Sequence, residues 1–237
     1  MRPSFVMTAL GLLAATGLAS RPQSNQRDPW QAPRTAMVEA QIKARGVKNA
    51  AVLNAMLRVP RHLFVPPNVR DRAYDDEPLP IGNDQTISQP FIVAYMTEAL
   101  DVHPDHTVLE IGTGSGYQAA VLAELARRVF TIEIVSELAE RARRTLAENG
   151  YKNVEVRAGN GYLGWPEHAP FPRIIVTAAP PQIPQTLVDQ LAIGGTMVLP
   201  VGGSTEFQQL VIVSKTASGV TEKRTLPVRF VPMVGGR

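Results

Sequence analysis

Cysteine is absent from this 237-residue sequence, which excludes a thiol nucleophile, a cysteine-ligated metal site and any disulfide. The sequence also lacks a strong excess of either charge, because its formal net charge is only +3 and no basic run dominates. A nucleic-acid-binding surface is therefore not expected. The chain does have a hydrophobic content of 44%, which is enough for one substantial core, and it shows no internal repeat or low-complexity tract.

A long apolar stretch opens the sequence, and a polar, proline-containing stretch follows it. This layout is typical of a secretory signal with a cleavage site near Ala19 or Ser20, and the stretch is too short and too rich in small residues for a membrane span. An alternative is a start codon assigned too far upstream, with Met37 as the natural start. Both interpretations leave residues 1–34 as an extension and linker outside the fold, and residues 35–237 as a single domain.

From residue 108 onward, short apolar segments alternate with segments of helical hydrophobic spacing. We expect strands at 108–111, 129–132, 154–156, 173–177, 196–200, 210–213 and 228–231. We expect helices at 35–46, 49–58, 90–100, 117–126, 136–149 and around 187–191. Strands that alternate with helices indicate an α/β fold with a doubly wound, mostly parallel sheet. The stretch at 75–83, rich in proline and acid, is expected to be an irregular loop.

The sequence is organised around residues 108–117, in which a short strand runs into Gly112, Gly114 and Gly116. Alternating glycines predict a tight turn before a helix, where the backbone can approach a ligand closely and free N–H groups point at it. The spacing is G-x-G-x-G and not the G-x-G-x-x-G of dinucleotide-binding dehydrogenases. Glu110 would repel a pyrophosphate. A carboxylate at this place suits a cofactor with positive charge, such as the amine and sulfonium of S-adenosylmethionine.

For three other polar residues, a role in function is compared with a purely structural role. Glu133 ends the second predicted strand about 20 residues after the first glycine, where doubly wound folds place an acidic acceptor for ribose hydroxyls. Ser88 is predicted to be the N-cap of the helix at 90–100, and its position in a polar loop just upstream of the glycine strand also makes it a candidate for the active site. His62 lies between apolar residues, so we expect it to have a packing role.

Longer strings point to a family. They are Pro80–Gly82, Gln85–Pro90, Val108–Ala120, Gly164–Pro166, Ile174–Ala179, Pro200–Gly202 and Phe230–Pro232. Through them the chain resembles the protein-L-isoaspartate O-methyltransferases, which use S-adenosylmethionine, over about residues 35–234. The resemblance implies a Rossmann-like methyltransferase fold. Its sheet would have seven strands with the last one antiparallel, and N-terminal helices and a C-terminal segment would help to close the site over a peptide.

The resemblance also implies roles for individual residues. Glu133 would hold the cofactor ribose, Gly112, Gly114 and Gly116 would form the turn, and Glu110 would lie near the cationic end of the cofactor. Thr86 and Ser88 would lie where methyl donor and substrate meet, with Ser88 as the catalytic hydroxyl that orients the substrate carboxylate. Asn160 and Gly161 would contact adenine.

The implied reaction transfers a methyl group to the free carboxylate of L-isoaspartyl residues in damaged proteins and starts repair through a succinimide. The expected partners are isoaspartyl peptides and proteins, with no nucleic acid and no stable membrane association apart from the N-terminal apolar segment. The resemblance implies a cytoplasmic enzyme, and we expect a monomer. If residues 1–20 are a true signal, the enzyme is instead exported.

Two residues depart from the family pattern. Asn160 stands where the family usually has an aspartate, and its amide oxygen could still accept a hydrogen bond from the adenine amino group. Restoring aspartate is therefore expected to tighten cofactor binding modestly. Asp84 replaces a small residue, commonly glycine, and could disturb a loop that must lie close to the donor.

Three rival functions remain open on the sequence. A nicotinamide-dependent oxidoreductase is disfavoured by the glycine spacing and by Glu110. A cofactor-binding protein without catalysis is conceivable because of Asp84 and Asn160. A methyltransferase that acts on another substrate, such as a small molecule or RNA, is the third, although the balanced charge argues against RNA.

Overall fold

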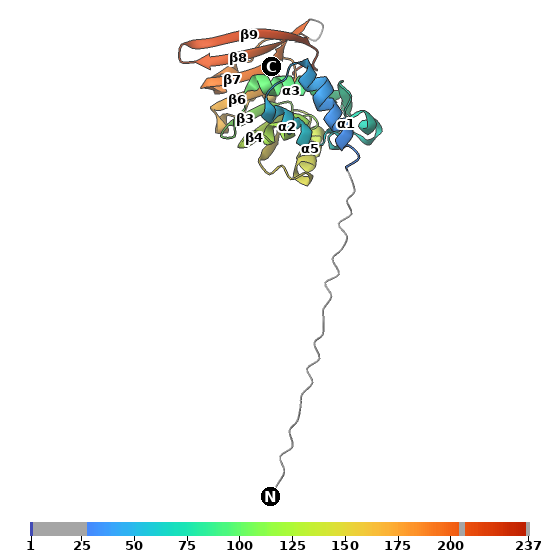
Figure 1. Cartoon of the computed structure of the whole chain (residues 1–237). Coiled ribbons are helices and arrows are strands. Elements are labelled where there is room, and N and C mark those ends of the chain that lie inside the picture. Colours follow the sequence, from blue (N-terminus) through green and yellow to red (C-terminus); the bar gives the residue numbers. More distant parts are fainter. Residues whose placement is uncertain (2–27, 204–206, 236–237) are drawn as a thin grey trace.

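The computed structural model describes Met1, residues 28–203 and residues 207–235. The predicted signal-like segment therefore lies outside the described residues, apart from Met1. The described chain forms a seven-stranded sheet with helices on both faces, together with a separate two-stranded hairpin (Figure 1). In these described ranges, none of the helices combines the length and the apolar character that a membrane crossing requires.

The seven strands lie in the order β5-β4-β3-β6-β7-β8-β9. Their bounds are β3 (Thr107–Ile111), β4 (Arg128–Glu133), β5 (Val154–Ala158), β6 (Phe171–Val176), β7 (Leu191–Val201), β8 (Gln208–Thr216) and β9 (Gly219–Val228). The pairings from β5 to β7 are all parallel, whereas β8 pairs antiparallel with both β7 and β9. The predicted doubly wound, mostly parallel sheet of seven strands is thus confirmed, and both of its antiparallel pairings are made by β8 near the end of the chain.

The central strands of the sheet are buried on both faces because their residues alternate between two apolar cores. Val108, Val129 and Ile175 belong to the core beneath α2 (Ala50–Arg58), α3 (Pro90–Leu100), α4 (Tyr117–Ala123) and α5 (Ser136–Glu148). Figure 1 shows α2, α3 and α5 in front of the sheet. Leu109 and Phe130 belong to the second core, which α6 (Gln185–Gln190) covers. Apolar residues at both odd and even strand positions are what a parallel sheet between two helical layers requires.

The N-terminal helices cover one end of the first core. The helix predicted at 35–46 begins earlier, as α1 (Gln31–Ala36), and continues through a π-helical stretch and a 3₁₀ turn to Arg45. His62 is 7% exposed, stacks on Trp30 with ring centroids 4.8 Å apart, and has its Nδ1 2.7 Å from Tyr74 Oη. The packing role predicted for His62 is confirmed.

Two segments fold differently from the sequence prediction. The final strand is β9 and not residues 228–231. It escaped detection because it is an edge strand whose residues are mostly exposed and polar, so it carries no apolar pattern. The stretch at 75–83 is not wholly irregular either, because it leads into a hairpin of β1 (Leu79–Gly82) and β2 (Gln85–Ile87). The hairpin buries Leu79, Ile81 and Ile87, and this alternation is the signal that the sequence reading missed.

Candidate active site

A cavity of about 990 Å³, open to solvent, lies at the carboxyl ends of β3, β4 and β6. It is lined by residues 85–88, Val93, 111–115, Tyr117, Gln118, 132–135, Gly161, Thr177, Ala178 and 231–234. The chain leaves β3 toward β4 and β5 and later returns to the other side of β3 as β6. This reversal is the topological switch point at which doubly wound sheets bind their ligands.

The glycine turn follows β3 with the predicted backbone conformation. Gly112, Gly114 and Gly116 have φ angles of 97°, 51° and 87°, which favour glycine strongly. A Cβ on Gly112 would lie 2.5 Å from the Thr177 hydroxyl, which donates to the Gly112 carbonyl at 2.6 Å. Gly112 and Gly114 line the cavity. Gly116 is not on the cavity wall and instead lets α4 approach Leu146 of α5, where a Cβ would lie 3.3 Å from that side chain.

Glu133 ends β4, is 5% exposed and lines the cavity. One carboxylate oxygen accepts from the Gly114 N–H at 2.8 Å, and the other accepts from the Val135 N–H at 2.9 Å. These two bonds fix the carboxylate before any ligand arrives and tie the glycine turn to the end of β4. A carboxylate oxygen can accept more than one hydrogen bond, so Glu133 retains acceptor capacity for a pair of hydroxyl groups.

Glu110 does not lie on the cavity wall. It sits in the middle of the sheet, opposite Thr131 of β4, and is completely buried. Neither of its carboxyl oxygens has a hydrogen-bond partner among the described residues. Burial raises the pKa of Glu110 to about 8, the nearby Thr131 hydroxyl acts against this rise, and the Glu133 carboxylate adds to it. Glu110 is buried away from the cavity lining, so its place in the fold gives no support to the expected position near the charged end of a cofactor.

The hairpin and the residue that follows it supply another part of the cavity wall, where Thr86 and Ser88 both line the cavity. Asn83 and Asp84 form its two-residue turn with φ angles of 54° and 55°. Two successive positive φ angles characterise the tight turn preferred in hairpins, and asparagine and aspartate tolerate this conformation best after glycine. Asp84 is exposed at the tip and does not line the cavity, so its conformation suits the turn, and its effect on the loop near the donor stays a prediction.

The predicted capping role of Ser88 is wrong. Helix α3 begins at Pro90 with Gln89 as its N-cap residue, and no side chain of that residue caps the helix. The carboxylate of Asp76 does this instead, because one oxygen accepts from the Phe91 N–H at 3.2 Å and the other from the Gln89 side chain at 2.7 Å. A residue twelve positions upstream thus replaces the expected local cap, and this frees the Ser88 hydroxyl from that duty.

The hairpin is tied to the rest of the molecule on two sides. The Arg141 guanidinium of α5 donates to the Ile81 carbonyl, and Asn83 donates to Glu137 at 3.0 Å. Arg141 is therefore partly buried and structural, whereas Arg143 and Arg144 of the same helix are exposed.

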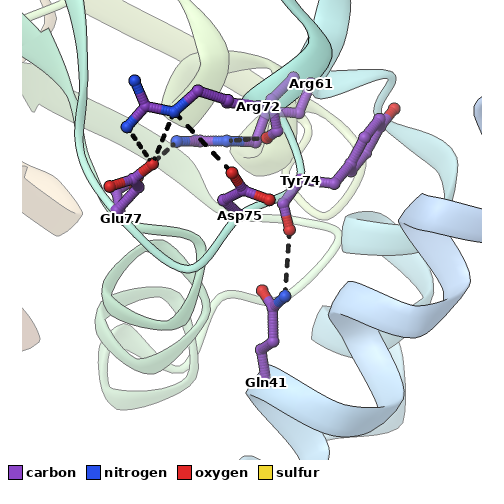
Figure 2. Close-up of polar contacts among 7 residues, drawn as sticks. Gln41, Arg61, Arg72, Tyr74, Asp75 and Glu77 are labelled. Atoms are coloured by element: carbon purple, nitrogen blue, oxygen red, sulfur yellow. Dashed lines mark hydrogen bonds and ion pairs between the residues drawn. The ribbon is translucent and has the colours of Figure 1, made fainter.

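On the other side, the segment leading into β1 is held by the buried Arg61 (Figure 2). Its Nε donates to the Ala73 carbonyl at 2.7 Å, and Gln41 donates to the Tyr74 carbonyl at 3.1 Å. Burial lowers the pKa of Arg61 to about 10, so the guanidinium stays charged at neutral pH.

Asn160 and Gly161 lie after β5, and only Gly161 lines the cavity. A Cβ on Gly161 would lie 2.3 Å from Ile111 Cγ2, so glycine is required at this close approach. The Asn160 amide oxygen accepts from the Tyr162 N–H at 3.0 Å, and its amide nitrogen donates to the Gly235 carbonyl at 2.6 Å. The contact of Asn160 with adenine stays a prediction, because both polar atoms of its side chain already have partners.

Sequence reasoning missed Thr177 and did not identify which residues of the C-terminal segment line the site. Thr177 closes the turn through its bonds to the carbonyls of Ile111 and Gly112. It directly follows β6, the strand next to β3, and that position could have identified it. Residues 231–234 of the C-terminal segment also line the cavity. The resemblance implied that a C-terminal segment helps to close the site, but the expected strand at 228–231 included only the first of these residues, and no local pattern indicates which of them line the cavity.

The lining suits the cofactor that the resemblance implies. Glu133 offers a fixed anionic acceptor for the two ribose hydroxyls, and Ile132, Val135 and Met233 offer apolar surface for a planar base. Thr86, Ser88, Thr113 and Ser115 add hydroxyl groups to the rest of the cavity. The residues present therefore fit S-adenosylmethionine.

Comparisons with known proteins agree with this geometry. Residues 32–237 match the family described as protein-L-isoaspartate(D-aspartate) O-methyltransferase. Two proteins named protein-L-isoaspartate O-methyltransferase, from Synechococcus sp. (strain JA-2-3B'a(2-13)) and Gloeobacter violaceus, are each 60% identical to the chain. The alignment with the first covers 87% of both chains, and the alignment with the second covers 83% of this chain and 96% of the relative.

Solved structures give the same result. A protein-L-isoaspartate O-methyltransferase superposes with a TM-score of 0.77 at 29% identity, over 85% of this chain and 66% of the other. A Plasmodium falciparum protein described as a beta-aspartate methyltransferase, solved with S-adenosyl-L-homocysteine, gives a TM-score of 0.74 at 25% identity, over 85% and 98% of the two chains. The chain therefore belongs to the protein-L-isoaspartate(D-aspartate) O-methyltransferase family, whose members use S-adenosylmethionine.

Proposed function

We propose that the chain carries out the reaction of its family in this cavity and that Ser88 is the side chain that orients the substrate. The reaction transfers a methyl group to the free carboxylate of an L-isoaspartyl residue. The observation that carries the role of Ser88 is its position on the cavity wall while Asp76 caps the helix that follows. A serine placed there without a capping duty is best explained by a hydrogen bond to a ligand.

The reaction requires the protein mainly to align the reacting groups. When bound, S-adenosylmethionine supplies a methyl group on a positively charged sulfur. The nucleophile is a carboxylate whose ordinary pKa near 4 leaves it ionised at neutral pH, so no general base is needed. The described residues that line the cavity accordingly include no histidine or lysine. Alignment of the reacting groups can contribute about 7–11 kcal/mol to lowering the barrier, and the walls of the cavity are suited to provide it.

The residues divide this work. Glu133 holds the ribose hydroxyls, and the backbone of Gly112 and Gly114 lets the cofactor approach β3. The Ser88 hydroxyl donates to the substrate carboxylate and aims one oxygen, and Thr86 lies beside it on the same hairpin. Once the ester has formed, its better leaving group allows the neighbouring backbone nitrogen to close a succinimide without the enzyme. Hydrolysis of that ring returns part of the protein to the normal aspartyl linkage, which is repair.

The decisive experiment measures transfer of radiolabelled methyl groups to an isoaspartyl peptide and to its normal aspartyl twin. We expect methylation of the isoaspartyl peptide alone. Equal methylation of both peptides would contradict the repair assignment, and binding of S-adenosylhomocysteine without any transfer would select a cofactor-binding protein without catalysis. Transfer to small molecules or RNA in place of the peptide would identify a methyltransferase with another substrate.

The proposal extends to the state of the protein in the cell. The enzyme would work as a monomer in the cytoplasm on isoaspartyl proteins, without a nucleic-acid partner. Sedimentation tests the monomer. Sequencing the N-terminus of the protein recovered from its own cells tests the location, because a mature chain that begins near residue 20 would indicate export.

A further inference from the structure

The last described residues of the chain, 230–235, form a strap across one side of the cavity. Residues 231–234 line the cavity together with Gly161 and the end of β4. The strap starts next to β8 and Ala179 and finishes beside Ile134 and Asn160. It therefore runs from the β6–β8 side of the cavity to the side formed by the ends of β4 and β5. Entry to this side of the cavity therefore depends on how firmly the strap is held.

The two ends of the strap are held in different ways. At its base, the Val231 carbonyl accepts from the Ala179 N–H at 2.8 Å, and the Met233 N–H donates back to the Ala179 carbonyl at 2.8 Å. The buried Gln208 side chain adds bonds to the N–H and the carbonyl of Phe230, at 2.6 and 3.1 Å. Tyr162 Oη adds a bond to the Met233 carbonyl at 3.2 Å. Beyond Met233, the tip is held in the described structure by the Asn160 side chain, which donates to the Gly235 carbonyl at 2.6 Å.

We propose that Asn160 is a positioning residue that fastens the tip of this strap and thereby sets the rate at which cofactor enters and leaves. The bond requires an amide, because its Nδ2 donates to the Gly235 carbonyl. Aspartate, the residue usual in the family, has no donor and would put a negative oxygen against that carbonyl. Asparagine at this position therefore makes a contact that aspartate would not make.

Gly235 provides independent support from the other side of the bond. Its φ angle of 100° is one that glycine adopts readily and other residues rarely do. A Cβ on this residue would lie 2.8 Å from the Asn160 Oδ1 and 2.9 Å from the Ile134 Cδ1. The tip thus fits between Ile134 and Asn160 only as glycine, and alanine there should unfasten it without adding charge.

The test measures association and dissociation of S-adenosylhomocysteine on the immobilised full chain by surface plasmon resonance, and it rests on the proposed cofactor site. Asn160→Asp retains the bond to the Tyr162 N–H and loses only the donor. We expect both rate constants to rise about five- to tenfold, the effect of losing one hydrogen bond. Gly235→Ala should do the same, and the double variant should show no further increase, because both changes break one contact.

Asn149→Asp is the matched control, since it also removes an amide donor to a carbonyl, that of Thr145 at 2.8 Å, away from the cavity. It should leave both rate constants unchanged. Slower dissociation from Asn160→Asp would overturn the proposal in favour of a direct adenine contact. Additive effects of the two changes would overturn it as well. Failure of the unaltered chain to bind S-adenosylhomocysteine would reject the cofactor site itself, and the strap proposal with it.

Discussion

The cavity has two walls that are built in different ways. The inner wall, formed by residues 111–115 and Glu133, follows buried parallel strands whose backbones pair along their length. The outer wall, formed by the hairpin β1–β2 and the strap, lies outside the parallel strands. Apart from the backbone bonds between Ala179 and the base of the strap, side-chain bonds hold it there, such as those of Arg141 to Ile81 and of Asn160 to Gly235.

This difference assigns a separate task to each wall. Distorting the inner wall requires breaking strand pairing and core packing, so it can hold the cofactor in one geometry. A single side-chain hydrogen bond contributes only about 0.5–1.5 kcal/mol net, so parts of the outer wall can open at modest cost. We infer that the inner wall determines cofactor affinity and that the outer wall determines substrate alignment and access.

The largest expected effect tests the inner wall. Gly112→Ala should lower the free energy of unfolding by about 2–5 kcal/mol, since it combines a left-handed backbone with a Cβ placed against Thr177. Gly150→Ala is the control, because Gly150 has a φ of 83° but no atom within 4 Å of a Cβ. Urea unfolding of both variants measures the difference, and equal losses would mean that close packing at the turn contributes nothing.

The buried Glu110 makes the inner wall sensitive to pH. Its folded-state pKa of about 8 lies above its ordinary value of 4.5, so the folded protein retains a proton that the unfolded chain releases. Stability should therefore fall as the pH rises from 4.5 to 8, by at most about 1.4 kcal/mol per pH unit. Glu110→Gln cannot lose this proton, and its stability should vary less over the same range. Urea unfolding at pH 5 and pH 8 compares the two chains, and parallel pH profiles would contradict the prediction.

Glu133→Ala tests cofactor affinity. The change removes the proposed ribose acceptor and also frees the Gly114 and Val135 N–H groups that the carboxylate now fixes. The dissociation constant for S-adenosylhomocysteine should rise about ten- to a hundredfold, as expected for losing hydrogen bonds to a charged group. Calorimetry measures it, with circular dichroism to verify the fold. Unchanged affinity would leave Glu133 with a purely structural role.

Ser88→Ala tests the outer wall. Turnover should fall about tenfold while cofactor affinity is retained, because the hydroxyl acts on the substrate carboxylate. Its unfolding free energy should change by less than about 0.5 kcal/mol, as expected away from a cap. Asp76→Ala, which removes the actual cap, should lose about 0.5–2 kcal/mol. If Ser88→Ala turns over like the unaltered chain, the proposed role of the hydroxyl is wrong.

The smallest expected effect tests whether the inner and outer walls act independently. Arg141→Met removes the donor to the Ile81 carbonyl and loosens the hairpin against α5. The KM for the isoaspartyl peptide should rise about fivefold, which corresponds to one hydrogen bond, with no change in affinity for S-adenosylhomocysteine. Arg144→Met, on the exposed face of the same helix, should change neither constant. A matching loss of cofactor affinity in Arg141→Met would show that the two walls are not independent.

Local sequence patterns predicted the inner wall well because its determinants are local. The apolar run of β3, the glycines after it and the acidic residue at the end of β4 are each readable within a few residues. The outer wall was predicted less well. Ser88 has the composition of a cap, and only the fold brings Asp76 to the helix start in its place.

The sequence by itself determined the alternation of strands and helices, the positive-φ turn at Gly112 and Gly114, and the family. It did so because backbone conformation and apolar periodicity act over short distances. The tertiary structure alone decided that Glu110 is buried off the cavity, that Thr177 closes the turn, and that the strap ends on Asn160. Each of these features depends on residues that are distant in the chain. No local propensity specifies which distant group will bury a side chain or satisfy its donor or acceptor.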